Sequence, residues 1–451
     1  MKILLIRPPD TALGEFKKVG GSQHPINLLY LADWVENCGH QASILDLEVE
    51  AFEDDSFSRR VKDVDAVGIT VMTPHMRTVG ELVRQIKSLG KPVILGGPHP
   101  SVLPEDTLAE TGADIAVVGE GETALAWILD DLERACQARV VRKPLIENMD
   151  DLPLPDRTRL DLDAYKGFST PGIFKKSTVL FTSRGCPFNC DFCAAKHIHG
   201  RRYRFRSIQS LREEMQQIRD LGFRHVTIDD DSFTVKRDRT LEFCDMMVAE
   251  FPDMTFDCDS RVDAVDAELL HAMKRAGCLK IAFGVESGSP RVLKRICKQI
   301  SVEQAVAAFE LSRKEGIETQ AFFTIGHLTE TLEDIDQSRA LIKRLKPDFL
   351  FVSVVTPYPG TALYDDLKEA GKLKGLDWHD FAFFKKTVPW NTDQLTGAEL
   401  AEIRDRMLRN YYFSPGFIFG KLVRLRSPAQ LRYYLSSAWA LVCHVGKRQK
   451  S

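Results

Sequence analysis

Short runs of apolar residues alternate with amphipathic segments along the first 140 residues of the chain. The apolar runs cover 2–8, 41–48, 66–72, 92–98 and 115–121, and the segments at 26–39 and 77–90 are typical of helices that end at a glycine. Continuous apolar strands that alternate with helices indicate a parallel sheet covered on both faces. The pattern therefore predicts an α/β domain over 1–140 with a doubly wound, Rossmann-like sheet.

A second series of strands and helices begins near residue 176. It follows a stretch at 141–175 that is rich in proline and aspartate and lacks periodicity, which we interpret as a linker. Six apolar runs then alternate with helical segments such as 207–222 and 266–277. Six strand–helix units predict a partial (β/α)6 barrel over 176–388, with the functional residues at the carboxyl ends of its strands.

The composition of the chain changes again at its C-terminal end, where 389–451 is predicted to form a helical extension. Residues 411–451 contain no aspartate or glutamate, whereas seven lysines or arginines follow from 421 onward, among aromatic and aliphatic residues. Such a basic, amphipathic tail either packs on the barrel with a solvated basic face or lies on an anionic membrane surface. The longest apolar stretch, 433–445, is too short to span a bilayer.

Length and composition narrow the class of protein. A chain of 451 residues is too long for one ordinary core, and its net charge of −3 gives no general attraction to nucleic acid. The first residues are predicted to form a buried strand rather than a secretory signal. Ten cysteines, three of them clustered, do not resemble a disulfide framework. We therefore expect a cytoplasmic protein with reduced thiols.

The clustered cysteines are Cys186, Cys190 and Cys193, in C-x3-C-x2-C spacing directly after a predicted strand. A [4Fe–4S] cluster normally takes four thiolates, so three leave one iron open to an exogenous ligand. A structural zinc ion would need a fourth ligand, which His197 or His199 could supply. The loop thus predicts an open iron–sulfur cluster, with a zinc site as the alternative.

This triad, with an aromatic residue before the third cysteine, resembles the signature of the radical SAM superfamily. The resemblance implies a [4Fe–4S] cluster whose open iron binds S-adenosylmethionine (SAM) and cleaves it to a 5′-deoxyadenosyl radical. It extends to the stretches "TIDDDSF", "CDSRVD", "GVESGSP", "FFTIGHLTET" and "TPYPGTALY". The implied SAM-binding residues are Phe192, Asp229, Asp230, Asp231, Arg261, Glu286 and Gly326.

Several of these residues have a plainer alternative. The three aspartates could form an ordinary acidic loop, and Arg261 a structural salt bridge. The stretch after Gly326 departs from the "GLPGET" pattern of the superfamily, because His327 and Leu328 stand there and its proline and second glycine are missing. Tyr358 is the candidate catalytic residue near the active face, or else a turn aromatic between two prolines.

The strand ends of the first domain resemble the cobalamin-binding domain found in many radical SAM enzymes. The matching stretches are "VGITVMTPHM", "VILGGPHPSVLPE" and "DIAVVGEGE", whereas no G-x-G-x-x-G follows the first strand. The residues implied to contact cobalamin are Thr70, Thr73, Gly96, Gly97, Gly119 and Glu120. None of the eleven histidines lies in a D-x-H-x-x-G motif, so histidine ligation of cobalt in that manner is not expected. The alternative is a scaffold domain without a ligand.

Together the two modules resemble cobalamin-dependent radical SAM enzymes, many of which are methyltransferases. The resemblance implies an enzyme that methylates an unactivated carbon of a small molecule through methylcobalamin and the 5′-deoxyadenosyl radical. One alternative is a cyclase, oxidase or rearrangement enzyme of tetrapyrrole, isoprenoid-lipid or natural-product biosynthesis, and another is a non-catalytic cobalamin or iron–sulfur sensor. The expected partners are a small-molecule substrate, with lipids and isoprenoids among the candidates, and a reductant such as flavodoxin or ferredoxin; no nucleic acid is expected.

Overall fold

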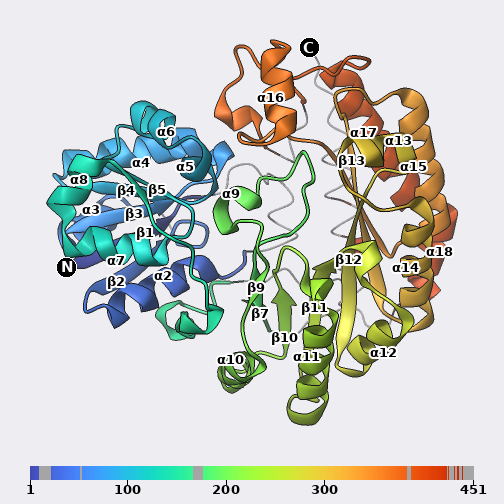
Figure 1. The fold of residues 1–451 in the computed structure, drawn as a ribbon, viewed down its shortest axis with the longest axis horizontal. Helices are drawn as coiled ribbons and strands as arrows, with labels where there is room; N and C mark the ends of the chain where they lie inside the picture. Colours follow the sequence, from blue (N-terminus) through green and yellow to red (C-terminus); the bar gives the residue numbers. More distant parts are fainter. Residues whose placement is uncertain are drawn as a thin grey trace.

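The computed structural model describes residues 1–9, 22–50, 53–165, 176–382 and 387–423, with 425, 431, 434, 435 and 439. Its two large sheets each contain six strands, all parallel, and lie side by side (Figure 1). No helix within these residues is long and apolar enough to cross a membrane. Of the seven basic residues counted from 421 onward, only Lys421 lies within the described residues.

The first sheet has the order β2-β1-β3-β4-β5-β6, which confirms the predicted doubly wound fold. Its strands are β1 (Lys2–Arg7), β2 (Gln41–Asp46), β3 (Ala66–Thr70), β4 (Val93–Gly96), β5 (Ile115–Val118) and β6 (Val140–Arg142). The first five match the five apolar runs. The sixth, β6, has only three residues and lies at the predicted end of the domain, where the apolar pattern alone gave no strand.

Helices cover both faces of this sheet. One face packs on α3 (Asp54–Lys62), α4 (Met76–Ser88) and α6 (Pro104–Thr111), and the other on α2 (Ile26–Asn37), α7 (Glu122–Asp130) and α8 (Leu132–Ala138). Four short helical segments complete this part of the chain: η2 (Thr73–His75), α5 (Pro98–Val102), η3 (Met149–Asp151) and η4 (Arg157–Arg159). Because alternate side chains of each strand enter opposite cores, both faces of the strands are apolar, as the continuous runs predicted.

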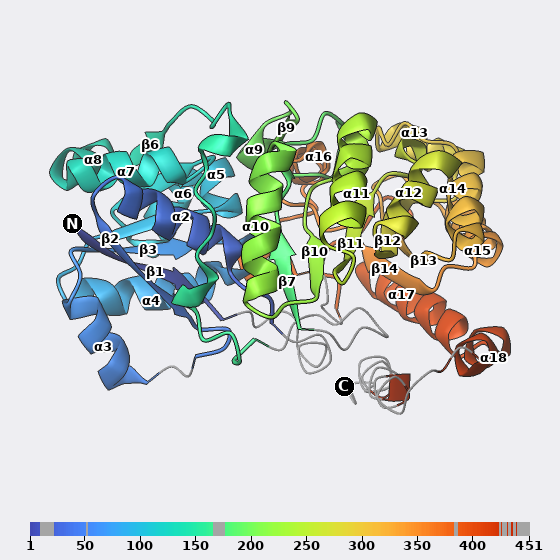
Figure 2. The same ribbon diagram turned by 90° about the horizontal axis from the view of Figure 1, so that it is seen from below.

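The second sheet has the order β14-β13-β12-β11-β10-β7, an open barrel of six sequential strands as predicted. The strands are β7 (Ser177–Leu180), β10 (His225–Ile228), β11 (Thr255–Ser260), β12 (Cys278–Glu286), β13 (Glu318–Ile325) and β14 (Phe349–Val354). The long helices around it are α10 (Ile208–Asp220), α11 (Arg237–Glu250), α12 (Ala267–Arg275), α14 (Val302–Lys314), α15 (Leu332–Leu345) and α17 (Gly397–Tyr412) (Figure 2). Capping boxes at Ser301, Thr331 and Thr396 define the starts of α14, α15 and α17.

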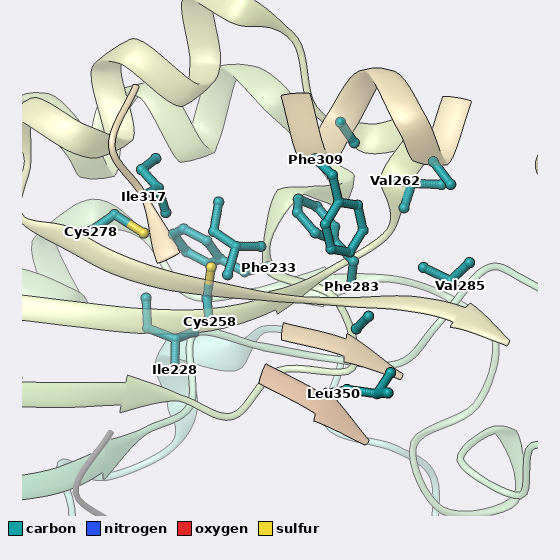
Figure 3. Packing of buried hydrophobic residues seen from close by; sticks show 14 of the residues in the cluster. Ile228, Phe233, Cys258, Val262, Cys278, Phe283, Val285, Phe309, Ile317 and Leu350 are labelled. Atoms are coloured by element: carbon teal, nitrogen blue, oxygen red, sulfur yellow. The ribbon is translucent and has the colours of Figure 1, made fainter. Parts of the chain in front are cut away.

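The barrel core lies between the outer face of the sheet and these helices. Phe233, Phe283 and Phe309 fill it, and Cys258 and Cys278 are buried among the same residues (Figure 3). These two thiols therefore behave as small apolar side chains, as expected for scattered cysteines.

Smaller elements complete this half of the chain. They are β8 (Ser183–Arg184), α9 (Lys196–His199), β9 (Arg204–Phe205), η5 (Phe233–Val235), η6 (Val262–Ala264), α13 (Pro290–Arg295), α16 (Ala362–Glu369), η7 (Trp378–Asp380) and α18 (Pro415–Val423). The first three lie around the cysteine triad, and α9 packs against α5 of the first domain (Figure 1).

Candidate functional site

The cysteine triad lies on a loop between β8 and β9, which pair with each other as a short antiparallel ribbon. Gly185 begins the loop with φ of +90°, and a Cβ there would lie 2.3 Å from the carbonyl oxygen of Arg202. Only glycine fits such a close approach of two backbones. The loop is therefore closed at its base, and each of its three cysteines is partly buried.

The two histidines that could complete a zinc site have other partners. His197 Nε2 lies 2.7 Å from the carbonyl oxygen of Gly360, and His199 Nδ1 lies 3.2 Å from Glu120 Oε1. Among the described residues, no three His, Cys, Asp or Glu side chains converge closely enough to hold a single metal ion. The three cysteines lie close enough for their charges to affect one another's pKa, as ligands of one polynuclear cluster must, and in such a cluster each thiolate binds its own iron.

The electrostatic surroundings of the thiols are mixed. Burial raises the pKa of Cys190 and Cys193, whereas the nearby Lys298 ammonium acts in the opposite direction. Burial also raises the pKa of Cys186, and the carboxylate of Asp231 adds to that effect. The protein thus lowers the cost of thiolate formation only in part, and bound iron would supply the remaining positive charge.

The three consecutive aspartates after β10 have different surroundings. Asp230 is buried and accepts hydrogen bonds from the backbone and hydroxyl groups of Thr182 and Ser183, which lead into the cysteine loop. Asp231 remains accessible and lies close enough to Cys186 and Cys193 to raise the pKa of both. Asp230 is therefore an anchor of the loop, and Asp231 is better placed for a ligand.

Asp229 is solvent-accessible but enclosed by the protein at the end of the sheet. Loss of surrounding water, together with the charges of Asp230, Asp231 and Asp257, raises the pKa of Asp229 to about 6. Asp259 on β11 is also accessible, and its pKa rises to about 7 because of its enclosure and its proximity to Asp229. This acidic pair was only half predicted, since Asp259 lies within a strand and outside any recognised motif.

Glu286 ends β12 with φ of +68°, a strained conformation for a residue other than glycine. Its Oε1 accepts a hydrogen bond of 2.9 Å from Lys298 Nζ, and both side chains are buried. The Oε2 atom lies 3.5 Å from the hydroxyl of Thr324, which in turn lies 3.0 Å from His327 Nε2. The carboxylate is thus held in place by groups that the sequence did not single out.

Arg261 lies beside the cysteine loop, with its guanidinium 3.7 Å from the ring centroid of Phe188. It donates two hydrogen bonds to Asp263, of 2.9 and 3.0 Å, and one of 2.8 Å to the carbonyl of Lys298. Arg261 thus makes the structural salt bridge that was the alternative, and its guanidinium also lies over a ring of the loop that carries the cysteines.

The turn after β13 departs from the superfamily pattern but is well ordered by its own side chains. Glu330 Oε2 accepts hydrogen bonds from the backbone N–H groups of Gly326 and His327. Burial raises the pKa of Glu330 to about 8 and lowers that of His327 to about 3. The ring of His327 contacts Phe192 of the cysteine loop with centroids 5.9 Å apart. Phe192 and Gly326, far apart in the sequence, are thereby brought together.

In the first domain, the predicted cobalamin-contacting residues lie along one edge of the sheet. Gly97 has φ of +104°, and a Cβ there would lie 3.1 Å from the Thr70 hydroxyl and from the backbone of Val71. The hydroxyl of Thr73 is buried and lies 3.1 Å from His99 Nδ1. The glycine pair is therefore required where the ends of β3 and β4 meet, and Thr73 already has a protein partner.

Glu120 and its neighbour Gly119 face the barrel. Gly119 follows β5 with φ of +84°, and a Cβ there would lie 3.7 Å from the carbonyl oxygen of Ile198. Glu120 is buried, and hydrogen bonds from His199, Arg204 and Ile146 N–H with an ion pair to Arg184 keep its pKa low despite its burial. The acidic residue predicted to contact cobalamin thus joins the two domains.

Tyr358 lies on the loop after β14 that contacts the cysteine loop. Its carbonyl oxygen accepts a hydrogen bond of 2.6 Å from the hydroxyl of Thr361. Two residues further on, the carbonyl oxygen of Gly360 lies within hydrogen-bond distance of His197 Nε2. A Cβ at Gly360 would lie 2.7 Å from Val102 of α5. The segment around Tyr358 therefore borders both domains.

Comparison with known proteins agrees with this arrangement. The family model of the B12 binding domain matches residues 16–129, and that of the radical SAM superfamily matches 180–342. An uncharacterized methyltransferase of Pyrococcus horikoshii is 29% identical, over 94% of this chain and 97% of its own. A bacteriochlorophyllide d C-8(2)-methyltransferase of Chlorobaculum tepidum is 28% identical, over 71% of this chain and 72% of its own.

Two proteins with lower sequence identity are also similar to this chain. An anaerobic magnesium-protoporphyrin IX monomethyl ester cyclase of Rubrivivax gelatinosus is 25% identical over 91% of this chain and 77% of its own. The structure of OxsB, a cobalamin-dependent S-adenosylmethionine radical enzyme solved with aqua-cobalamin and S-adenosylmethionine bound, superposes with a TM-score of 0.75. At 16% identity it covers 98% of this chain and 71% of its own, and so supports the fold.

Proposed function

Because this chain belongs to the cobalamin-binding radical SAM enzymes, we propose that it transfers a methyl group from SAM to an unactivated carbon of a small molecule. The observation that carries the proposal is the place of the cysteine loop, which packs against α5 and the β5 end of the cobalamin-binding domain. The two cofactor regions are therefore adjacent. When bound, the cluster and cobalamin supply reductive cleavage of SAM and carriage of a methyl group, respectively.

The residues of the chain would hold and orient these groups. Cys186, Cys190 and Cys193 are the proposed cluster ligands. Asp231 and the Glu286 carboxylate lie at the same mouth and would accept hydrogen bonds from the amino and hydroxyl groups of SAM. These side chains fit a [4Fe–4S] cluster with bound SAM. Three thiols can bind three of the four irons, and two carboxylates, Glu286 held by Lys298 and Asp231 near Cys186, lie close to them.

Further site residues are proposed on the same grounds. Phe192, Gly326, Arg261 and Asp229 surround the mouth of the barrel and would complete the SAM pocket. In the first domain, Thr70, Gly96 and Gly97 would border cobalamin, with Thr73 and Gly119 beside them. Tyr358 remains the proposed catalytic residue from the loop after β14.

Methyl transfer can be separated from the alternative reactions by product analysis. The protein would be reconstituted anaerobically with iron, sulfide and cobalamin, then incubated with a reductant, a cell extract and SAM labelled in its methyl group. We expect 5′-deoxyadenosine, S-adenosylhomocysteine and a labelled small molecule. Formation of 5′-deoxyadenosine with an unlabelled product would favour a cyclase, oxidase or rearrangement enzyme. Absence of both SAM products would indicate a sensor.

We also propose that the C-terminal part of the chain contacts an anionic phospholipid bilayer. Phe419, Leu422 and Val423 on α18 expose 70%, 54% and 68% of their surface. Beside them lies a groove of about 580 Å³ whose lining includes the basic side chains of Arg339, Lys343 and Lys346, with the buried Lys421, which pairs with Asp348. An apolar helix face next to several cations matches a surface of anionic lipids.

Co-sedimentation with vesicles tests this surface. The wild type should bind vesicles that contain phosphatidylglycerol and not vesicles of phosphatidylcholine alone, and Phe419→Ser should reduce binding. Val248→Ser is the matched control, because Val248 is 38% exposed on α11, none of whose residues lines the groove. Equal binding by the wild type and Phe419→Ser would remove the membrane from the proposal.

A further inference from the structure

The base of the cysteine loop carries two arginines that face each other. In the β8–β9 ribbon, Arg184 is the cross-strand partner of Arg204, and residues 185–203 between them contain the three cysteines. The side chains of both arginines are buried, with 9% and 2% of their surface exposed. Like charges directly opposite each other destabilise an antiparallel pair, so this ribbon needs a counter-charge to stay closed.

The counter-charge comes from the other domain. Arg204 donates two hydrogen bonds to Glu120, of 2.8 Å to Oε1 and 3.0 Å to Oε2, and Arg184 Nη1 lies 3.2 Å from Oε1. Arg184 also donates a 2.6 Å hydrogen bond to Glu122, the first residue of α7. Bidentate pairing fixes orientation as well as distance, because both nitrogens of the guanidinium must meet both oxygens.

The same carboxylate reaches the far side of the loop and the linker. His199, at the end of α9, lies 3.2 Å from Oε1, and the N–H group of Ile146 donates a hydrogen bond of 2.9 Å to Oε2. One buried side chain from the end of β5 thus binds both strands of the loop base and the helix within the loop. Glu120 contacts none of the cysteines.

We propose that Glu120 is a positioning residue: it holds the base of the cysteine loop closed and sets the loop at a fixed place against the cobalamin-binding domain. The inference rests on the proposed function, in which the two cofactor regions act in one reaction. In this role Glu120 fixes the two cofactor regions relative to each other, in place of the direct cobalamin contact expected from the sequence.

Amide hydrogen exchange of the cofactor-free chain tests the closure of the loop without any turnover. In Glu120→Gln, the buried Arg204 loses its charged partner and Arg184 keeps only Glu122, and we expect exchange in 185–203 to become about tenfold faster or more. The matched control is Glu36→Gln, which breaks the bidentate pair between α2 and Arg159 but touches no residue of the loop. It should leave exchange in 185–203 at the wild-type rate.

A second measurement concerns the loaded enzyme. Reductive cleavage of SAM requires the cluster alone, whereas methyl donation also requires the correct place of the cobalamin domain. We therefore expect the ratio of 5′-deoxyadenosine to S-adenosylhomocysteine to rise in Glu120→Gln and to stay unchanged in Glu36→Gln. Wild-type protein that forms neither product would refute the proposed function but would leave the exchange result valid.

An unchanged loop and an unchanged product ratio in Glu120→Gln would overturn the positioning role. Wild-type exchange rates in 185–203 and a wild-type product ratio for Glu120→Gln would show that the loop is closed without this carboxylate. Should Glu120→Gln not fold, the double variant Glu120→Gln/Arg204→Gln removes the buried charge that has lost its carboxylate, whereas Arg184 keeps Glu122. It should fold and still show faster loop exchange than Glu36→Gln, and loop exchange as slow as in the wild type would likewise overturn the proposal.

Discussion

Replacement of Asp230 by asparagine should destabilise the protein and loosen the cysteine loop. The carboxylate accepts four hydrogen bonds, two from Thr182 and two from Ser183, and Asp230 is 4% exposed. In asparagine one oxygen can still accept from the two N–H groups, and the NH₂ group would face the two hydroxyls, which would have to turn and accept. Since a hydrogen bond to a charged group contributes about 1.5–3 kcal/mol and a neutral one about 0.5–1.5 kcal/mol, replacement of four charged bonds by neutral ones gives an expected decrease of about 4 kcal/mol in the free energy of unfolding.

Urea unfolding of the cofactor-free chain measures this decrease, and iron content after anaerobic reconstitution measures the effect on the loop. The control is Asp229→Asn, the same chemical change one residue away. Asp229 is solvent-accessible, and its pKa of about 6 reflects enclosure and repulsion by neighbouring carboxylates. Its neutralisation should therefore not lower stability and should raise it at pH 7, where the folded chain holds the ionised carboxylate at a cost. Equal losses in the two variants would refute the distinction between an anchoring and a ligand-facing aspartate.

Three further predictions concern the turn after β13, the start of the loop and the domain junction. Burial raises the pKa of Glu330 to about 8 in the folded chain, above its unfolded value. The contribution of Glu330 to the free energy of unfolding should therefore be fully present below about pH 4.5 and be lost as the pH rises to 8. Glu330→Gln should flatten this pH dependence in urea titrations at several pH values. Gly185→Ala should abolish iron binding after reconstitution because a Cβ would meet the backbone, whereas Gly39→Ala, with φ of +88° and no atom within 4 Å, should bind iron normally. Glu214→Gln should cost about 3–5 kcal/mol in thermal or urea unfolding, since it leaves two buried arginine charges without their carboxylate; an unchanged midpoint would contradict this.

Most of the fold follows from the apolar pattern, because a strand buried on both faces must be apolar throughout. The five runs before residue 140 and the six after 176 all became strands of the two sheets. Strand β6 was missed because three residues with one arginine carry no periodicity. The cysteine spacing likewise identified the loop, since ligands to one cluster have to be close in the sequence or in space.

The directions of individual side chains could not be predicted in this way. Three adjacent aspartates look equivalent in the sequence, and only the place of Thr182 and Ser183 separates Asp230 from its neighbours. Lys298 was missed because its inward direction depends on the turn around it. Cys297 and Gln299 have φ of +55° on either side of it, a conformation that neither residue favours by itself.

The junction between the domains is built from directed polar contacts as well as apolar packing. Glu214 of α10 binds Arg157, which lies in the stretch between the sheets, and Arg206, whose guanidinium also donates to the hydroxyl of Tyr30 in the first domain. Apolar contact is non-directional and tolerates small rotations, whereas arginine–carboxylate pairs retain their energy only near one geometry. Rotation of one sheet relative to the other would break the buried ion pairs of Glu120 at the loop base and the hydrogen bond from Arg206 to Tyr30. A reaction that needs two cofactors at a fixed separation has reason to use such a junction.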